Sequence, residues 1–243
     1  MVNLKNLLES DPTLLAADAA LVEYAAKQVK RDYLGASVIG EPCSRKLWYG
    51  LQPDIERKPF DAASLKRFAD GFYVEDVTIK RLRAVSGVEL WDRQEDGEQI
   101  GGKLFNGKFG YHVDGVIRGL IQSPKTPHVF ECKAVNEVKF NKFKKLKLEL
   151  GEKQTLAAWD VIYFAQAIIY CYLLELTRHY TVVCTPGARD WDSCRTEANN
   201  KMGEQLLRKS ERVINAKDAP ERISNDKNFY LCKFCDYRDA CHG

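Results

Sequence analysis

Two short apolar segments of the chain carry acidic residues at positions that a β-sheet would bring together. Asp114 lies in residues 110–117 and Glu131 in residues 128–135, and both segments have the apolar and β-branched content of strands. Turn-forming residues separate them at 123–127. We therefore expect a hairpin in which Asp114 and Glu131 lie side by side.

Lys133 follows Glu131 by two residues, and because side chains alternate along a strand, both should point to the same face. That face would hold two carboxylates and one ammonium group. Carboxylate oxygens are the ligands that Mg²⁺ prefers, and a lysine can hold an attacking water or a phosphate oxygen. The alternative is a surface salt bridge. The apolar neighbours of Glu131, however, place it at the edge of a core strand, where a buried carboxylate needs a partner.

The composition is that of a globular protein. Of 243 residues, 45% are hydrophobic and 29% charged, enough for one large domain or one domain with an appendage. A net charge of +3 does not by itself indicate a nucleic-acid-binding protein. Residues 1–5 begin no apolar signal segment, and the longest apolar run, 161–174, is short for a bilayer span. We expect a cytoplasmic protein with no membrane partner, whose eight cysteines bind metal or are buried.

The pattern of elements predicts an α/β fold with a small mixed sheet flanked by helices. Helices are expected at 12–34, 41–49, 61–85, 155–177 and 197–216, and strands at 88–91, 99–105, 108–117, 129–134 and 180–185. We divide the chain into an N-terminal helical segment (1–35), a core (36–230) and a cysteine-containing tail (231–243).

Gln166 is the strongly polar residue of the apolar run 161–174, and Tyr170 follows it on the same helix face. A buried amide must find a hydrogen-bond partner. An active site or a phosphate backbone would supply one, and the alternative is a satisfied core glutamine beside a packed tyrosine.

Glu75 is a candidate third acid for the metal site. It lies in a predicted helix, where Asp76 is a rival for the same role and a solvated helix face is the alternative. Gly71 in the same helix costs about 1 kcal/mol relative to alanine, and we interpret it as a point of close approach by another backbone.

The C-terminal tail has the spacing of a metal site. Cys232, Cys235 and Cys241 supply three thiols, whereas structural zinc sites and cubane iron–sulfur clusters usually take four ligands. Cys43 begins a proline-led helix and is our preferred fourth ligand. Spacing alone does not separate zinc from iron–sulfur, and either would join the two ends of the chain, with a loop-entropy gain on the order of 5 kcal/mol.

A basic run with interleaved phenylalanines follows the predicted Glu-x-Lys strand directly. Its lysines would contact phosphates and its phenylalanines would stack on unpaired bases. The alternative, given equal weight, is a solvated helix whose phenylalanines face the core. The predicted DNA-binding residues are Lys139, Phe140, Lys142, Phe143, Lys144 and Lys145, with Arg45 from the N-terminal part.

Taken together, these motifs resemble the RecB-like branch of the PD-(D/E)XK nuclease superfamily in its iron–sulfur form, which includes CRISPR-associated RecB-like nucleases and phage exonucleases. The resemblance covers about residues 36–243 and implies a restriction-endonuclease-like core. It implies Mg²⁺ or Mn²⁺ at Asp114 and Glu131, with Lys133 orienting the nucleophile. Gln166 and Tyr170 match the family's Gln-x-x-x-Tyr motif.

The resemblance also implies a 4Fe–4S cluster held by the four cysteines that are candidate ligands in this chain. Those residues are Cys43, Cys232, Cys235 and Cys241. One departure is Glu75, since many members have a metal-binding histidine there.

The function expected from this resemblance is a metal-dependent DNA exonuclease of phage or prokaryotic recombination, repair or processing, with single-stranded DNA favoured. A helicase, recombinase or integrase is an expected partner. Two alternatives remain open: a nuclease that trims DNA for an integrase in CRISPR adaptation, and a non-cleaving iron–sulfur DNA-binding subunit.

Overall fold

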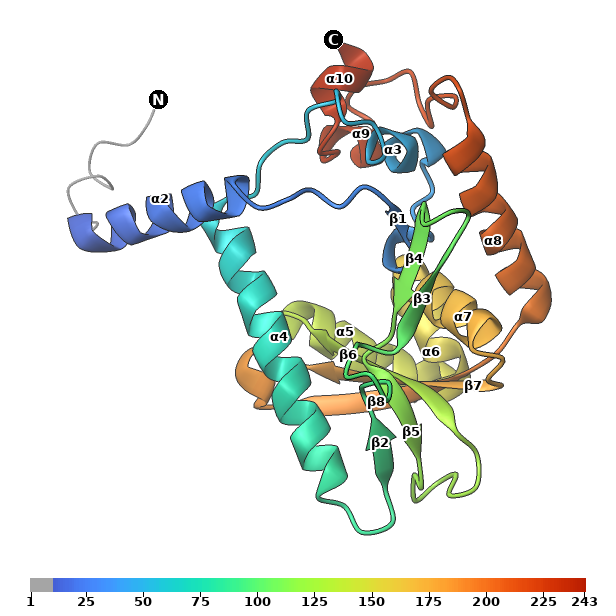
Figure 1. Cartoon of the computed structure of the whole chain (residues 1–243). Coiled ribbons are helices and arrows are strands. Elements are labelled where there is room, and N and C mark those ends of the chain that lie inside the picture. The colour runs from blue at the N-terminus through green and yellow to red at the C-terminus, as the bar shows by residue number, and fades with distance from the viewer. Residues whose placement is uncertain (1–10) are drawn as a thin grey trace.

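A five-stranded mixed sheet forms the centre of the protein (Figure 1). The computed structural model describes residues 11–243, so the first ten residues of the predicted N-terminal segment lie outside the described residues. Only the contact between β6 and β7 is parallel, and the other neighbouring strands of this sheet are antiparallel. In order across the sheet, the strands are β2 (Glu89–Trp91), β5 (Gly115–Arg118), β6 (His128–Ala134), β7 (Arg178–Cys184) and β8 (Trp191–Glu197).

The predicted hairpin is formed by β5 and β6, which pair with Gly115 opposite Phe130. This register places Asp114, one residue before β5, beside Glu131. Strand alternation then divides β6 between the two faces of the sheet. Phe130 and Cys132 belong to the apolar cluster under one covering helix, whereas Val129 belongs to the cluster on the opposite side.

Helices cover both faces of this sheet (Figure 1). On one face lies α4 (Ala62–Arg83), whose Val74 and Ile79 pack with Phe130 of β6. The other face is covered by α5 (Glu137–Leu150), α6 (Glu152–Trp159) and α7 (Val161–Leu173). The mixed α/β architecture expected from the sequence is therefore confirmed.

The strand predicted at 108–117 is two strands in the structure, and the first of them belongs to a second, three-stranded sheet. It has the order β1 (Leu34–Gly35), β4 (Phe109–His112) and β3 (Gly101–Leu104), and η1 (Ala36–Val38) follows β1. The chain leaves this sheet after β4 and enters the five-stranded sheet at β5. Asp114 therefore lies at the junction of the two sheets.

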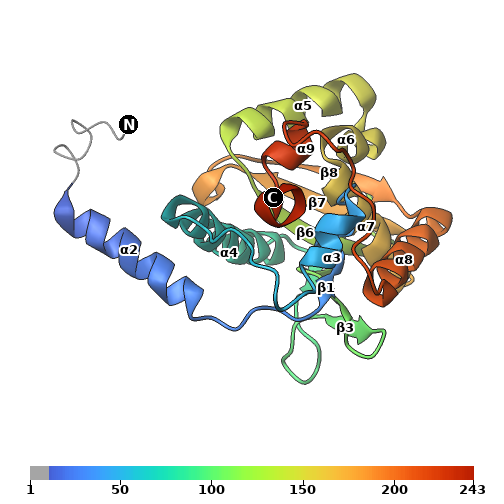
Figure 2. The same ribbon diagram turned by 90° about the horizontal axis from the view of Figure 1, so that it is seen from above.

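Two predicted helices are shorter than expected. The helix predicted at 155–177 is interrupted at Asp160, whose backbone is extended (φ −155°, ψ 110°) and whose carboxylate accepts hydrogen bonds from the amides of Ile162 and Tyr163. The helix predicted at 12–34 ends earlier, as α2 (Pro12–Ala26). No residue of α2 is buried, and Figure 2 shows it projecting from the body of the protein.

The remaining helices bring distant parts of the chain together (Figure 1). Helix α8 (Asn200–Asn215) packs against α7 and against the short helix α3 (Ser44–Tyr49). Its contact with α7 is close, because a Cβ on Gly203 would lie 2.6 Å from the Cβ of Tyr172. Short elements complete the fold: η2 (Pro186–Ala188), α9 (Tyr230–Lys233) and α10 (Arg238–His242). Within residues 11–243, no helix combines the length and the hydropathy that a bilayer crossing requires.

Candidate active site and cysteine centre

The two predicted metal-binding carboxylates are held against each other by the backbone of β6. Oδ2 of Asp114 accepts a 2.7 Å hydrogen bond from the backbone amide of Cys132. This bond fixes the Asp114 carboxylate beside β6, although the residue itself lies outside the strand. Cys132 donates its amide here while its side chain points to the other face, into the cluster under α4.

Glu131 is 4% exposed, and its two carboxylate oxygens differ sharply in their contacts. Oε1 accepts hydrogen bonds from Nζ of Lys133 at 2.6 Å and from Nε2 of Gln166 at 2.7 Å. Oε2 is buried and has no hydrogen-bond partner among residues 11–243. A buried carboxylate oxygen without a donor is costly, which makes Oε2 a candidate ligand atom for a cation.

Helix α7 supplies the polar contact that the sequence anticipated for Gln166. Nε2 of Gln166 donates to the hydroxyl oxygen of Tyr170 at 3.1 Å as well as to Glu131. Both side chains are buried, and burial followed by the charge of Glu131 raises the pKa of Tyr170. Gln166 and Tyr170 therefore lie within the acidic site rather than in an unrelated part of the core.

The acids of this site repel one another. Burial raises the pKa of Asp114 well above its usual range, and the neighbouring charge of Glu131 adds to the shift. Burial and Glu131 likewise raise the pKa of Glu75. Burial alone would lower the pKa of Lys133, but Glu131 and Asp114 outweigh it and raise that pKa, so the ammonium group stays protonated.

Glu75 on α4 lies close enough to Glu131 and Lys133 for their charges to shift its pKa. Its rival Asp76 instead forms a 2.6 Å ion pair with Lys80 on the exposed side of α4. Arg93, which the sequence analysis did not identify, lies near enough to lower the pKa of Glu75. No local sequence pattern marks Arg93, because it follows β2 and reaches the site only through the fold.

Tyr163 is a second residue of the site that sequence reasoning missed. Its ring lies 4.9 Å from Nζ of Lys133 and 4.5 Å from Nζ of Lys139, within cation–π range. The available signal was its position three residues before Gln166, on the same side of the helix. Tyr163 therefore links the Glu-x-Lys strand to the basic helix that follows it.

The side chains of the acidic site fit a divalent cation by their chemistry. Asp114, Glu131 and Glu75 offer carboxylate oxygens, the ligands that Mg²⁺ and Mn²⁺ prefer. The unpartnered Oε2 of Glu131 and the raised pKa values of the other two acids indicate uncompensated negative charge. In the arrangement seen here, no three His, Cys, Asp or Glu side chains of residues 11–243 converge enough to hold a metal ion.

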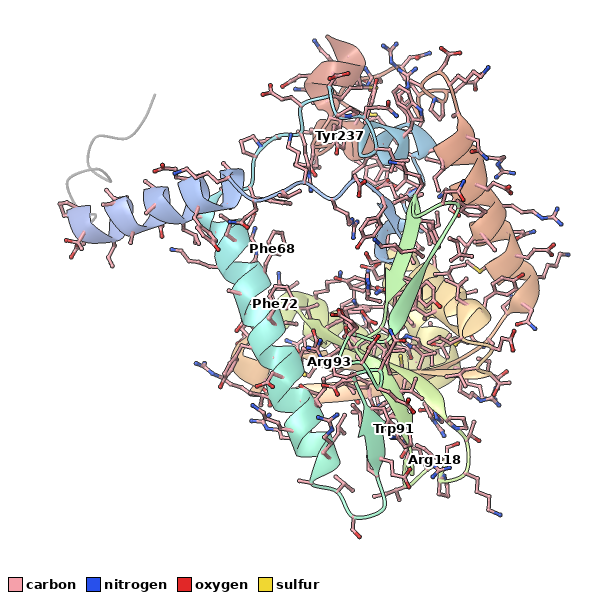
Figure 3. All side chains as sticks on the ribbon, in the orientation of Figure 1. Phe68, Phe72, Trp91, Arg93, Arg118 and Tyr237 are labelled. Atoms are coloured by element: carbon pink, nitrogen blue, oxygen red, sulfur yellow. The ribbon has the colours of Figure 1, made fainter. Side chains whose placement is uncertain are left out.

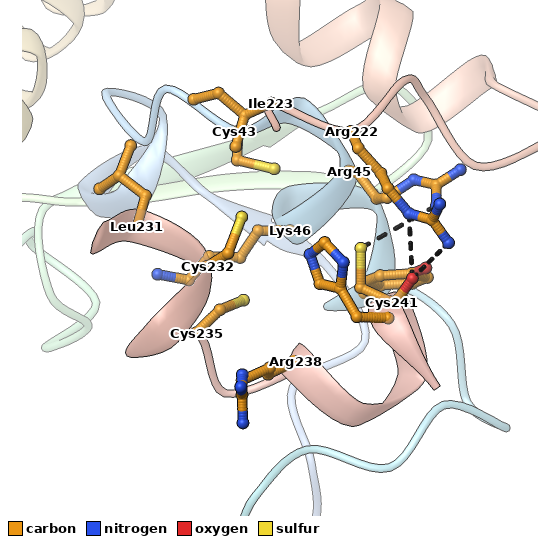
Figure 4. Close-up of a pocket in the computed structure, with 12 residues that line it drawn as sticks. Cys43, Arg45, Lys46, Arg222, Ile223, Leu231, Cys232, Cys235, Arg238 and Cys241 are labelled. Carbon is orange, nitrogen blue, oxygen red and sulfur yellow. Dashed lines mark hydrogen bonds between the residues drawn. The ribbon is translucent and has the colours of Figure 1, made fainter. Parts of the chain in front are cut away.

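The four predicted cluster ligands line one hollow of about 360 Å³, a volume that includes its opening to solvent. Figure 4 shows Cys43 beside the start of α3 and the other three thiols on the C-terminal segment. Burial, followed by the charges of neighbouring cysteines, raises the pKa of Cys232. By their chemistry, four sulfur donors around one hollow suit zinc or an iron–sulfur cluster, although in the arrangement seen here no three thiols of the described residues converge enough to hold a metal ion. The predicted ligands are Cys43, Cys232, Cys235 and Cys241.

Hydrogen bonds from α3 to backbone carbonyls hold the C-terminal segment in place. Arg45 donates to the carbonyl oxygen of Pro220 at 2.5 Å, and the indole of Trp48 donates to Ala216 at 2.9 Å. The hydroxyl of Tyr49 donates to the carbonyl of Ala240 at 3.4 Å. The two halves of the cysteine centre are thus positioned by α3 and by backbone atoms from 216–241.

Glu41 anchors the segment that carries Cys43. Its buried carboxylate pairs with Lys46 at 2.7 Å and accepts a hydrogen bond from the amide of Cys43 at 3.4 Å. From α8, Lys209 donates to the carbonyl oxygens of Ile39 and Glu41 at 2.9 Å and 2.6 Å. The remaining cysteines, Cys132, Cys171, Cys184 and Cys194, are buried in the core, as interpreted from the sequence.

The basic run forms α5, and its phenylalanines do not reach solvent. Phe140 is 5% exposed and Phe143 is fully buried, so the predicted base-stacking role is wrong for both and the core-facing alternative holds. Lys139 pairs with Asp160 at 2.7 Å, at the edge of the acidic site. Lys142, Lys144 and Lys145 are exposed, and their predicted contact with phosphates stays a prediction.

Two further expectations meet a different environment. Arg45 was predicted to bind DNA, but its guanidinium donates to backbone carbonyls and contacts Sγ of Cys241 at 4.0 Å beside the cysteine hollow. Gly71 was interpreted as a point of close backbone approach, but a Cβ there would meet no atom within 4 Å. The space beside Gly71 is therefore open, and that interpretation is wrong.

No protein-family model and no curated protein sequence matches the chain. Among solved structures, it is similar to the protein SSO0001 at 14% identity, covering 95% of this chain and 96% of that one, with a TM-score of 0.49. It is also similar to the alkaline exonuclease LHK-Exo from Laribacter hongkongensis at 12% identity, over 76% and 87% of the two chains, with a TM-score of 0.49.

A third neighbour is a phage-related exonuclease from Haemophilus somnus 129PT, with 12% identity, 73% and 78% coverage and a TM-score of 0.43. Two of the three neighbours are thus named as exonucleases. At these identities and TM-scores, the likeness shows neither a family nor an activity for this chain.

Proposed function

We propose that this protein is a metal-dependent nuclease that hydrolyses phosphodiester bonds at DNA ends, with single-stranded DNA favoured. The observation that carries the proposal is the unpartnered, buried Oε2 of Glu131 beside Asp114, with Lys133 bound to the other oxygen. A structural salt bridge alone would leave no reason to bury a second carboxylate next to this pair. The match of these residues to the RecB-like nuclease motifs supports the same assignment.

Each residue has a role that follows from its contacts. Asp114 and Glu131, with Glu75, would hold Mg²⁺ or Mn²⁺, which supplies positive charge at the scissile phosphate and lowers the pKa of bound water. Lys133 is held protonated by its acidic neighbours, so it binds the attacking water or a phosphate oxygen. Gln166 fixes the Glu131 carboxylate, and the exposed lysines of α5 attract the DNA backbone.

A cleavage assay tests this proposal. End-labelled single-stranded, blunt duplex and circular DNA should be incubated with Mg²⁺, with Mn²⁺ and with EDTA. We expect the linear substrates, and not the circular one, to be cleaved, and only when metal is present. Asp114→Ala or Lys133→Ala should lower the cleavage rate by about 100-fold or more. Asp76→Ala is the matched control, because its carboxylate pairs with Lys80 away from the site, and it should retain activity. Undiminished cleavage by Asp114→Ala would overturn the assignment.

We further propose that the cysteine hollow holds a structural metal centre, with an iron–sulfur cluster preferred to zinc on the family resemblance. The four thiols line a single hollow, and a metal there would fasten α3 to the C-terminal segment. Elemental analysis and visible absorbance of anaerobically purified protein distinguish iron from zinc. Cys43→Ser should lose the metal, whereas Cys171→Ala, in the core between α7 and its neighbours, should keep it.

A further inference from the structure

Helix α4 carries an aromatic stripe, formed by the exposed side chains of Phe68 and Phe72, on the side of the helix that also holds Glu75. Phe68 and Phe72 lie seven and three residues before Glu75, so the helical period places all three on one side of α4. Phe72 is 74% exposed and Phe68 is 46% exposed. In Figure 3 both side chains leave α4 on the side that faces the rest of the molecule.

The side of α4 that carries the stripe is buried against the sheet near the end of the helix, and it is open where Phe68 and Phe72 lie. Ile79, one turn beyond Glu75, packs into the apolar cluster against the sheet. Around Gly71, in contrast, an added Cβ would meet nothing within 4 Å. The stripe therefore continues past the last contact of this side of α4 with the core and into open space, within about two turns of Glu75.

Two contacts on other sides of α4 hold the helix in place, and a third reaches Phe68 of the stripe itself. Asp70 accepts a 3.0 Å hydrogen bond from the backbone amide of Gly187 in η2, and Lys66 pairs with Asp18 of α2 at 2.7 Å. The ring of Phe60 packs edge-on against Phe68 with centroids 4.9 Å apart. The ring of Phe68 is therefore partly covered by Phe60, whereas the side chain of Phe72 is largely exposed.

The charges beside this stripe favour an anionic partner over another apolar surface. Arg67 precedes Phe68, and Arg93 lies near Glu75; both are exposed, and neither forms an ion pair within the described part of the chain. Arg57 stacks over Phe60 at 4.2 Å but is paired with Asp236 at 2.7 Å, so the positive charge available to an anionic partner comes from Arg67 and Arg93. Aromatic rings interleaved with cationic groups are how proteins bind unpaired nucleic acid strands, with rings taking bases and cations taking phosphates.

We propose that Phe72 and Phe68 stack on unpaired bases of the DNA strand entering the active site, and that they set a preference for single-stranded ends. This inference rests on the proposed nuclease function and names its substrate-selecting residues. At 1.5 Å per residue the two positions are roughly 6 Å apart along α4, more than the 3.4 Å between stacked bases. Each ring therefore takes a different base, and a base inside a duplex, whose two faces are already stacked on its neighbours, cannot be taken.

Binding measurements on cleavage-deficient protein test the proposal. In an Asp114→Asn background, fluorescence anisotropy of a labelled oligothymidylate of about 12 nucleotides should show roughly tenfold weaker binding for Phe72→Ala. Phe72→Trp should bind as tightly as the parent. Tyr73→Ala is the matched control: Tyr73 is 57% exposed but lies on a different side of α4, and its affinity should change by less than about twofold.

A scan with abasic sites makes the test specific for stacking. One abasic position should weaken binding of the parent protein and cause no further loss in Phe72→Ala, because the ring and the base form one interaction. Blunt duplex should bind both proteins equally. Equal losses for Phe72→Ala and Tyr73→Ala, or additive abasic and Phe72→Ala losses, would overturn the proposal. So would a change of oligomeric state in Phe72→Ala by light scattering, since the stripe would then be a protein interface.

The two levels of inference fail separately. Metal-dependent cleavage by the wild type with no effect of Phe72→Ala on single-stranded DNA would refute the stacking role alone. Abasic-dependent binding in a protein that cleaves no DNA would refute the nuclease proposal and retain the base-stacking surface.

Discussion

Replacing Gln166 by leucine tests whether the amide on α7 supports the charged form of Glu131. Gln166 is 3% exposed, and its Nε2 donates to Glu131 and to Tyr170. Leucine has a similar volume, so the packing of α7 should change little. The variant isolates the loss of the two hydrogen bonds.

The expected cost follows from the nature of each bond. A hydrogen bond to a charged group contributes about 1.5–3 kcal/mol, and a neutral one about 1 kcal/mol. Burial of the leucine side chain offsets about 1 kcal/mol of the loss. We therefore expect Gln166→Leu to lower the free energy of unfolding by about 2 kcal/mol, which corresponds to a fall in Tm of roughly 4–8 °C for a chain of this size.

Urea unfolding of metal-depleted protein at neutral pH measures this difference from the change in midpoint. Tyr170→Phe, which removes only the neutral bond, should cost about 1 kcal/mol. Gln154→Leu is the matched substitution on the exposed side of α6 and should change stability by less than about 0.5 kcal/mol.

A double-mutant cycle with Glu131→Gln separates the charged bond from general packing. With the charge removed, the cost of Gln166→Leu should fall to about 1 kcal/mol or less. A cost below about 0.5 kcal/mol in the wild type, or an equal cost in both backgrounds, would refute the reasoning that Gln166 stabilises the Glu131 carboxylate.

Three further predictions concern the acids, the core and helix α4. Burial and the charge of Glu131 raise the pKa of Asp114 above its usual value of 3.8, so the free energy of unfolding falls as pH rises above about 3.8. In EDTA, Asp114→Asn should therefore raise the free energy of unfolding at pH 7 by about 1–3 kcal/mol, and this difference should vanish near pH 4 in a Tm–pH series. Mg²⁺ should stabilise the wild type and not this variant. Phe143→Ala should cost about 3–5 kcal/mol in urea unfolding, whereas Lys144→Ala should stay within about 0.5 kcal/mol, and a small loss for Phe143→Ala would contradict its core position. Gly71→Ala should stabilise α4 by about 0.5–1 kcal/mol by calorimetry, since the added methyl meets no atom, and a destabilised variant would argue against an open face there.

The acidic site could be predicted in outline because it depends on local periodicity. Alternation along one strand puts Glu131 and Lys133 on the same face, and a turn between two strands is enough to bring Asp114 beside them. The four-residue spacing of Gln166 and Tyr170 works in the same way for a helix. These relations hold whatever the rest of the fold does.

The parts that could not be predicted depend on contacts between distant segments. Asp160 interrupts an otherwise helical pattern because its side chain caps α7 and pairs with Lys139, which no local signal announces. The strand β8 (Trp191–Glu197) was missed because its composition is largely polar and its pairing with β7 supplies its order. The spacing of Phe140 and Phe143 is the same for a core face and for a DNA-binding face, so the sequence left both possible.

Arg93 and Phe72 illustrate the same limit from the other side. Neither belongs to a motif, and only the fold shows that Arg93, after β2, lies near Glu75 and that Phe72 is exposed on α4. In a sequence, an exposed phenylalanine cannot be told from a core phenylalanine, because only the fold shows whether another element covers it.

The way α3 holds the C-terminal segment has a consequence for how this protein can diverge in evolution. Arg45, Trp48 and Tyr49 donate to main-chain carbonyls of Pro220, Ala216 and Ala240, atoms that every residue type possesses. The accepting positions can therefore drift in sequence without losing the interaction, while the three donors cannot. Selection that keeps α3 and the C-terminal segment together therefore restricts the sequence of α3 more than that of the C-terminal segment. Apart from its cysteines, the C-terminal segment is free to acquire new surfaces.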